Sequence, residues 1–438
     1  MQFLESSLRL DSLSKKCNES GKNYFPVEEL IMAVDSKVSS FFEEYRKEII
    51  EMEKKLSSIP AIAPEGGGDG EAKKCAFIEE FLKEHGFNDV VKYEAPDPRV
   101  SAKVRPSLVV TIPGINDDYN IWVMAHMDVV PTGDLSLWNS DPWTVVEKDG
   151  KLIGRGVEDN QQGLVSAFYA AYYYVKNNIK PGHTIKLLFV ADEENGSTYG
   201  IKYLLKNENL FKKEDLIIIP DGGDSKGETI EIAEKNILWL DFKVIGEQTH
   251  GSRPDSGANA CLAACDLTLR IHNLEKVFNK KDDLFEPNYS TIQPTKRYKN
   301  VDSINIIPGE DHLCFDCRFL PCYKLCDVLK EVDKVVAEVE KEHNVKITYT
   351  TPQYAESPAT PVDAPVAQAL AKALKTVHNI DAKFIGIGGG TVGGELRCEN
   401  YNAIVWSTLD DQAHQPNEYC IVDNLIKDGE TLVEVFKN

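Results

Sequence analysis

Histidines and carboxylates that can bind metal ions follow several apolar segments of this sequence. In IWVMAHMDVV, His126 and Asp128 lie on the same side of an extended chain, because side chains alternate between the two faces of a strand. A carboxylate beside a histidine is typical of metal sites, where it holds the second ring nitrogen. Such a pair also occurs as a plain hydrogen bond at a strand end, so it needs further ligands to predict a metal site.

Further carboxylates follow other segments. Asp192, Glu193 and Glu194 end the apolar LLFVADEENGS, and Asp159 lies in the glycine-flanked GRGVEDNQQG before an expected helix. Adjacent carboxylates at a buried strand end repel one another unless cations neutralise them. A solvated acidic turn is the alternative, but the apolar residues in front of Asp192 favour a buried cluster.

Two more segments complete the set of candidate ligands. DLIIIPDGG ends at Asp221, with Asp224 as the alternative, and AIVWSTLDDQAHQPNEY supplies His414 with Asn417 and Glu418 beside it. Two histidines and several carboxylates at the ends of separate strands form a nitrogen and oxygen ligand set that suits zinc, cobalt or manganese.

The elements that carry these residues have the pattern of an α/β fold. A long amphipathic helix is expected from Val27 to Leu56, and the strands SLVVTI, IWVMAHMD, TIKLLFVADEE and DLIIIPD then alternate with helices near residues 162–177 and 199–205. Continuous apolar strands are typical of a mostly parallel sheet covered by helices on both faces. Ligands collect at the carboxyl ends of such strands, where the candidate ligands are found.

The pattern changes from about Asn236 onward. Six segments follow in the order β-α-β-β-α-β. They are the strand ILWLDFKVIG, the helix ANACLAACDLTLRIHNL, the strands SINIIP and HLCFDCRFLP, a helix from Leu325 to about Glu342, and the strand VKITYT. That is the order of a ferredoxin-like α+β domain. Helix and strand patterns of the first kind return after it, so we expect a discontinuous main domain at residues 1–235 and 353–438. An N-terminal extension is expected at 1–40 and an inserted domain at 236–352.

Charge and composition exclude several classes of partner. The 438 residues include 70 acidic and 49 basic side chains, a net charge of −21. This excess repels nucleic acid and anionic lipid, so neither is expected as a partner. No apolar run of about 18 residues occurs, and the opening MQFLESSLRLD lacks the apolar core of a signal peptide. We expect a cytoplasmic protein that does not enter a membrane.

The ten cysteines agree with a reducing compartment, because they do not form the dense framework of a small secreted domain. A cluster of four is compatible with a zinc or iron–sulfur site: Cys314, Cys317, Cys322 and Cys326. However, Cys314 and Cys317 fall on opposite faces of the expected strand. We therefore expect these four to be buried thiols.

The motifs H-x-D, G-x-x-D, D-E-E-x-G, P-D-G and H-x-P-N-E, in this order, resemble those of the dizinc amidohydrolases and exopeptidases. That family includes aminoacylases, acetylornithine deacetylases, succinyl-diaminopimelate desuccinylases, glutamate carboxypeptidases and dipeptidases. The resemblance extends from about Ile49 to the end of the chain. It implies an α/β fold of the zinc-exopeptidase type, with the inserted domain as a lid.

The resemblance also implies roles for the candidate ligands. Two divalent metal ions are implied, zinc first, with cobalt or manganese as alternatives. Their ligands would be His126 and Asp221 for one ion, Glu194 and His414 for the other, and Asp159 as the bridge. Asp128 would orient His126. Glu193 would be the general base, which takes a proton from the attacking water between the ions and returns it to the leaving amine.

The expected lid carries further matches. THGSRPDSGANA resembles the lid motif whose histidine, here His250, stabilises the oxyanion; an exposed loop histidine is the alternative. Asn305, Arg318 and Thr391 match positions that hold the substrate's carboxylate or close the site, and an arginine fork suits a planar carboxylate. Arg318 as an ordinary surface residue is the alternative. The family implies a homodimer through the lid, and whether His250 acts in its own or the partner's site stays open.

These matches predict a metal-dependent hydrolase that cleaves an amide bond next to a free carboxylate. Its substrate is expected to be a small acylated amino acid or a short peptide, for a deacylase, carboxypeptidase or dipeptidase. One alternative is a specific succinyl-diaminopimelate desuccinylase, against which VGGELR counts because those enzymes commonly carry Asp and Arg there. Another is an inactive metal-binding relative that acts as a scaffold.

Overall fold

The computed structural model describes residues 27–438, with side chains from residue 36 onward. Helix α2 (Val27–Ser57) begins and ends close to the predicted positions. The first 26 residues, which contain the opening segment and most of the predicted extension at 1–40, lie outside the described residues. Residues 48–438 form one compact unit, and the description below concerns this unit.

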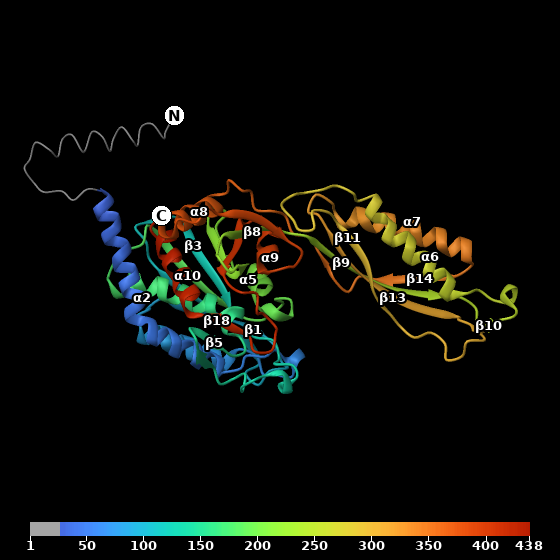
Figure 1. Ribbon diagram of the computed structural model, residues 1–438, viewed down its shortest axis with the longest axis horizontal. Helices are drawn as coiled ribbons and strands as arrows, with labels where there is room; N and C mark the ends of the chain where they lie inside the picture. Colours follow the sequence, from blue (N-terminus) through green and yellow to red (C-terminus); the bar gives the residue numbers. More distant parts are fainter. Residues whose placement is uncertain (1–26) are drawn as a thin grey trace, which may run out of the picture. The chain divides into compact units, whose positions relative to one another are not determined.

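A mixed sheet of eight strands forms the centre of the main domain (Figure 1). Its order across the sheet is β1 (Val90–Pro96), β2 (Val104–Ile112), β6 (His183–Val190), β3 (Asn116–His126), β7 (Leu216–Asp224), β17 (Ala403–Thr408), β8 (Thr229–Glu234) and β16 (Lys383–Ile387). The central pairs of β3 with β6 and β7, and of β7 with β17, are parallel. The predicted mostly parallel sheet is confirmed at the strands that carry the candidate ligands.

Helices cover both faces of this sheet because its central strands are apolar on both sides. One face contacts α4 (Gly163–Lys176), α8 (Pro365–His378) and α10 (Val422–Val435), and the other contacts α9 (Val392–Cys398). Helix α5 (Ile201–Asn207) packs beside α9, and α3 (Ala72–Glu84) packs on β2. The first twelve residues of α4 are all buried, which agrees with a helix that is apolar on every side.

The segment from β9 to β14, which we name the lid, forms a separate antiparallel sheet. Its strands lie in the order β11 (Thr291–Arg297), β13 (Glu310–Phe319), β9 (Asn236–Ile245) and β14 (Lys346–Thr350). Helices α6 (Ala260–His272) and α7 (Leu325–His343) pack together on one face of this sheet (Figure 1). This is the strand order of a ferredoxin-like fold, so the predicted fold class is confirmed. The exact domain boundaries stay a prediction.

One strand of the lid was assigned to the wrong segment. The predicted strand SINIIP contributes only β12 (Ile306–Ile307), which pairs with β10 (Thr249–His250) outside the main lid sheet. The second strand of the lid is β11, whose sequence TIQPTKR is mostly exposed. Strand β11 lies at the sheet edge and contains a proline with a register shift beside it, so its sequence lacks the apolar pattern of an inner strand.

The expectation of four buried thiols in the lid is also wrong for three of them. Cys317 is buried, Cys314 is half-buried, and Cys322 and Cys326 are exposed. The predicted opposite orientation of Cys314 and Cys317 agrees with the alternating burial along β13. Among the described helices, none is long and apolar enough to cross a membrane.

Candidate metal centre

The carboxyl ends of four neighbouring strands bring the candidate ligands together. Strand β3 ends at His126, β7 carries Asp221 near its end, and His414 follows β17. The turn after β6 carries Glu193 and Glu194. Because β6, β3, β7 and β17 are successive parallel neighbours, their carboxyl ends meet at one edge of the sheet.

His126 is buried among carboxylates. Its Nδ1 donates to the backbone carbonyl oxygen of Asp128 at 3.0 Å, and its Nε2 lies 2.9 Å from Asp159 Oδ1 and 3.5 Å from Asp221 Oδ1. Burial opposes the charged imidazole, but the carboxylates, Asp221 foremost, raise the pKa of His126 well above its usual value. A positive charge is therefore favoured at Nε2, and a proton or a metal ion can supply it.

Asp159 lies between the two histidines. Its Oδ1 faces His126, and its Oδ2 lies 3.1 Å from His414 Nε2, which is also 3.0 Å from Glu194 Oε2. Hydrogen bonds to Asp159 and Glu194 raise the pKa of His414 to about 10. Burial opposes ionisation of Asp159, but the two imidazoles lower its pKa well below the usual range. The two oxygens of Asp159 thus face two separate positive centres.

The backbone N–H groups of Glu193 and Glu194 are held by the side chain of Asp128. The carboxylate of Asp128 accepts the backbone N–H groups of Glu193 and Glu194, each at 3.1 Å. The predicted contact of Asp128 with His126 is made mainly through the backbone, since the nearest carboxylate oxygen is 3.5 Å from Nδ1. Burial raises the pKa of Glu193 well above its usual value and that of Glu194 to about 7.

Glu418 anchors the loop that carries Asp159. The buried carboxylate of Glu418 accepts the backbone N–H groups of Gly156, Glu158 and Asp159 at 3.0 to 3.1 Å, and Arg155 donates to it at 2.6 Å. Glu418 lies four residues after His414, and no role was predicted for it from the sequence. Its place in the motif H-x-P-N-E was the available signal.

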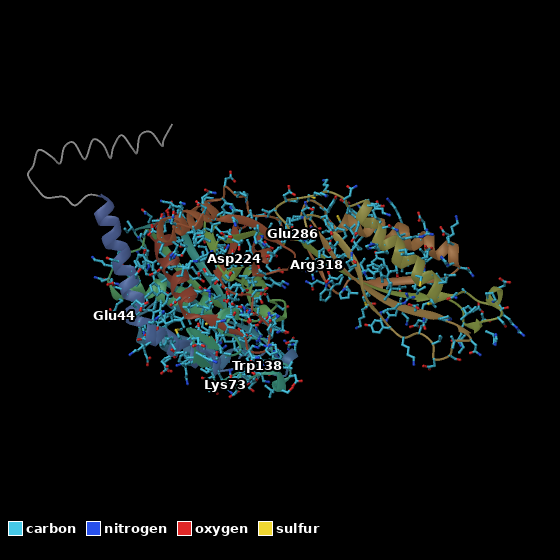
Figure 2. All side chains as sticks on the ribbon, in the orientation of Figure 1. Glu44, Lys73, Trp138, Asp224, Glu286 and Arg318 are labelled. Atoms are coloured by element: carbon cyan, nitrogen blue, oxygen red, sulfur yellow. The ribbon has the colours of Figure 1, made fainter. Side chains whose placement is uncertain are left out.

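Asp224, the alternative to Asp221, is used elsewhere. Its carboxylate accepts the backbone N–H groups of Lys226 and Thr229 at 2.7 Å each, so it closes the turn after β7 (Figure 2). Asp221, by contrast, accepts from the Asn160 side chain at 2.7 Å and faces His126. Of the two candidates, Asp221 is the one that joins the cluster.

A cavity of about 390 Å³ opens onto this cluster. Its lining includes Asp159, Glu193, Glu194, Asp221 and His414. It also includes Thr391, whose hydroxyl donates to Glu234 at 2.7 Å, and Glu231, for which the sequence predicted no role. Burial raises the pKa of Glu231 to about 8. A glutamate inside the otherwise apolar strand TIEIAE was the signal for it.

Three predicted residues of the lid do not line this cavity. His250 is exposed, and its Nδ1 lies 2.8 Å from the hydroxyl of Ser252. The backbone carbonyl oxygen of Asn305 accepts from Gly251 at 2.7 Å, so this residue lies beside the His250 loop. Arg318 (Figure 2) pairs with both carboxylate oxygens of Asp316 and donates from Nη1 to the Gly388 carbonyl oxygen at 2.9 Å.

The cluster fits a pair of divalent cations. Two groups of three donor atoms each lie within 4.8 Å of one another: His126, Glu193 and Asp221, and His126, Asp159 and Glu194. Glu194 Oε1 is buried and has no hydrogen-bond partner among residues 36–438. Carboxylates packed this closely require positive charge between them, and the nitrogen and oxygen donors suit zinc, cobalt or manganese.

Comparison with known proteins identifies the family. The model of peptidase family M20/M25/M40 matches residues 122–438. The chain belongs to this family. An uncharacterized metallohydrolase of Methanocaldococcus jannaschii is 39% identical over 408 residues, which cover 89% of this chain and 99% of that protein. The chain is therefore an enzyme, a metallohydrolase of peptide or amide bonds, as the sequence predicted.

More distant matches include one curated relative and two solved structures of the same fold. A succinyl-diaminopimelate desuccinylase of Rickettsia bellii is 28% identical over 393 residues, covering 88% of this chain and 94% of the relative. A tripeptidase of Staphylococcus aureus matches with a TM-score of 0.73 at 18% identity, over 90% of this chain and 98% of its own. A dinuclear metal-binding peptidase of Bacillus subtilis matches with a TM-score of 0.63 at 14% identity, over 90% and 98%.

Proposed function

We propose that this metallohydrolase cleaves an amide bond next to a free carboxylate, by direct attack of water. The observation that carries the proposal is the cavity in which Asp159 lies between two histidines while Glu193 stands beside it. His126 and Asp221 would hold one divalent ion, Glu194 and His414 the other, and Asp159 both. When bound, such ions supply Lewis acidity, which polarises the scissile carbonyl and lowers the pKa of water.

Glu193 is proposed as the general base. It lines the cavity with Glu194, but the Glu194 carboxylate is already directed to His414, which leaves Glu193 free to exchange a proton. Glu193 takes a proton from the attacking water and returns it to the leaving amine. Asp128 holds both glutamates through their backbone N–H groups, so it acts as a positioning residue for the base.

Recognition of the substrate carboxylate is assigned to Arg318 and Thr391. No arginine or lysine belongs to the lining of the cavity in the described chain, so a cation must come from outside it. Arg318 already contacts the glycine stretch at Gly388, and this stretch continues to Gly390 and Thr391 in the cavity wall. Arg397 is less suitable, because it is buried and paired with Glu234 at 2.6 Å. Asn305 and His250 are proposed to act on the substrate from the lid, His250 on the oxyanion.

The test compares substrates with a free carboxylate and the same substrates blocked as amides. Acetyl, succinyl and glutamyl amino acids and dipeptides form the panel, each assayed with zinc, cobalt and manganese. Blocking should lower kcat/KM of the wild type strongly, by about 2–5 kcal/mol for a buried charged group left unmatched. Arg318→Ala should respond little to blocking. If Arg318→Ala still prefers the free acid strongly, another residue reads the carboxylate.

The same panel separates the alternatives. A specific succinyl-diaminopimelate desuccinylase would hydrolyse only the succinyl substrate, and a scaffold relative would hydrolyse none while binding metal. The complete set of ligands and the presence of Glu193 favour a working enzyme. Zinc is proposed as the metal, because the histidine and carboxylate donors suit it.

A homodimer through the lid is also proposed. Leu262 and Leu269 are 58% and 63% exposed and lie seven residues apart on α6, hence on one face of the helix. Paired apolar side chains of this kind favour a contact with a second copy. Sedimentation of the wild type and of Leu262→Glu tests the dimer.

A cytoplasmic location stays a prediction, which the free thiols of all described cysteines support.

A further inference from the structure

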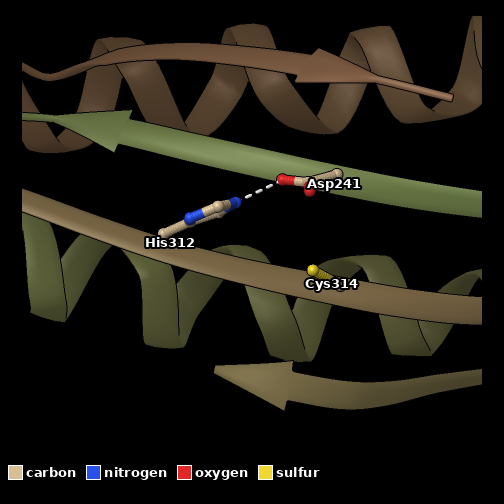
Figure 3. Close-up of side chains that lie close together, drawn as sticks. All are labelled: Asp241, His312 and Cys314. Carbon is tan, nitrogen blue, oxygen red and sulfur yellow. Dashed lines mark hydrogen bonds and ion pairs between the residues drawn. The ribbon is translucent and has the colours of Figure 1, made fainter. Parts of the chain in front are cut away.

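A second group of metal-binding side chains lies on the outer face of the lid sheet, away from α6 and α7. Asp241 on β9 is the direct cross-strand partner of Cys314 on β13, and His312 precedes Cys314 by two residues on the same face (Figure 3). Side chains at such paired positions lie about 4.5–5.5 Å apart at Cβ, and diagonal neighbours are still in reach of long side chains. The register of β9 with β13 therefore gathers a carboxylate, an imidazole and a thiol.

The three donor atoms converge. One ligand atom each from Asp241, His312 and Cys314 lies within 4.8 Å of the other two. His312 Nε2 is hydrogen-bonded to Asp241 Oδ1, as the dashed line in Figure 3 shows. The ring of Tyr298 stacks on His312 with centroids 4.0 Å apart and planes 10° apart, which holds the imidazole in place.

The chemistry of this set differs from that of the catalytic cluster. Zinc takes sulfur, nitrogen and oxygen ligands at about 2.0–2.3 Å in a tetrahedron, and the three residues offer one donor atom of each kind. Magnesium and calcium prefer oxygen ligands alone, so a thiol and an imidazole exclude them. Two of the three donor residues, Asp241 and Cys314, line a cavity of about 360 Å³, which has room for a water molecule as the fourth ligand.

We propose that Asp241, His312 and Cys314 form a third metal site, which takes one zinc ion and leaves its fourth position to water. The ion would link β9 to β13, the two inner strands of the lid sheet. None of these three residues takes part in the proposed catalytic mechanism. An ion pair of His312 with Asp241 that merely has a thiol beside it is the competing explanation, and such half-exposed pairs contribute little to stability.

Cobalt distinguishes the two explanations, because a thiolate ligand to Co²⁺ produces an intense near-ultraviolet charge-transfer band and histidine or carboxylate ligands do not. The whole chain, stripped of metal, is titrated with CoCl₂. The wild type should develop the band, and Cys314→Ser should lack it and bind one equivalent less zinc. Cys322→Ser, which removes an exposed cysteine of the lid, is the matched control and should behave as wild type.

A second measurement avoids any dependence on the folding of the variant. Wild-type protein is alkylated with iodoacetamide with and without zinc, and each cysteine is followed by peptide mapping. Zinc should protect Cys314 at least tenfold, whereas Cys322 and Cys326 should react equally in both samples. His312→Gln should raise the zinc concentration that half-protects Cys314 by at least roughly 10–100-fold, the loss of metal affinity that removal of even a supporting residue causes. Absence of the charge-transfer band at saturating cobalt, or equal alkylation of Cys314, would overturn the proposal.

Discussion

Glu193 offers the most direct test of the proposed mechanism, because it is assigned the role of general base. Glu193→Gln keeps the size of the side chain but cannot accept a proton, so hydrolysis should fall by about 10²–10⁴-fold. The metal content should stay at the wild-type value, because Glu194, not Glu193, is directed to His414. Steady-state kinetics and metal analysis of the purified variant check both statements. Retained activity with lost metal would mean that Glu193 and Glu194 exchange roles.

Glu418 should affect the site indirectly, because it holds the loop that carries Asp159. Glu418→Gln leaves Arg155 buried without its charged partner and removes acceptors from backbone N–H groups. The free energy of unfolding should fall by about 3–5 kcal/mol, the usual cost of breaking a buried ion pair. Urea unfolding measures it, and a metal titration should show weaker binding as well.

The control for Glu418→Gln is Glu51→Gln, which removes an exposed partner of Lys54. That change should cost no more than about 1 kcal/mol. Equal effects of the two substitutions would show that Glu418 does not hold the loop of Asp159.

At the scale of elements, α8 and α10 are joined by a half-buried histidine. His378 Nε2 lies 3.2 Å from the Lys427 carbonyl oxygen and 3.1 Å from the Thr431 hydroxyl. Burial lowers the pKa of His378 below its usual value, so the unfolded chain binds a proton more readily than the folded one. This contribution to stability is complete above about pH 6.5 and is lost as the pH falls through the lowered pKa.

His378→Gln should therefore lose less stability than the wild type between pH 7 and 5. Urea unfolding in the presence of EDTA measures this, because chelation removes the separate pH dependence of metal binding. The glutamine amide can still donate to the Lys427 carbonyl oxygen, so stability at pH 7.5 should change little. Parallel pH curves for the two proteins would contradict the prediction.

For the whole molecule, the metal ions are expected to contribute to stability as well as to catalysis. Removal of metal leaves buried carboxylates that the protonated histidines neutralise in part, as the pKa of His414 near 10 indicates. The apo-protein should therefore stay folded but melt at a lower temperature. A ligand at about 100 times its dissociation constant stabilises by about 2.7 kcal/mol per site.

Thermal unfolding with EDTA and with added zinc measures this difference, and activity should be absent in the first sample and return in the second. Two equivalents of zinc per chain should restore activity in Cys314→Ser. Equal melting temperatures for the chelated and the zinc-loaded protein would show that the ions do not bind the folded centre.

Local patterns were enough to predict many features of this protein. The apolar strands that end in His126 and Asp221, and the helix patterns between them, depend on neighbours a few residues apart. The sequence therefore indicated the α/β sheet, the ferredoxin-like order and the group of candidate ligands at the strand ends. The choice of Glu193 as the general base depended on the resemblance to the family motifs. By contrast, the apolar content of SINIIP predicts a buried strand of the lid sheet, but that place is taken by β11, which is polar and pairs with β13 at the sheet edge.

Only the tertiary structure decided which partners the polar side chains find. The Asp128 carboxylate holds Glu193 and Glu194 from 65 and 66 residues away, and Glu418 holds the Asp159 loop from 259 residues away. Asp241 meets His312 across 71 residues through the strand register. Sequence spacing carries no information about such pairs, because register and burial result from the packing of the whole chain. The sequence therefore determined the kinds of ligand present, and the fold determined which of them meet.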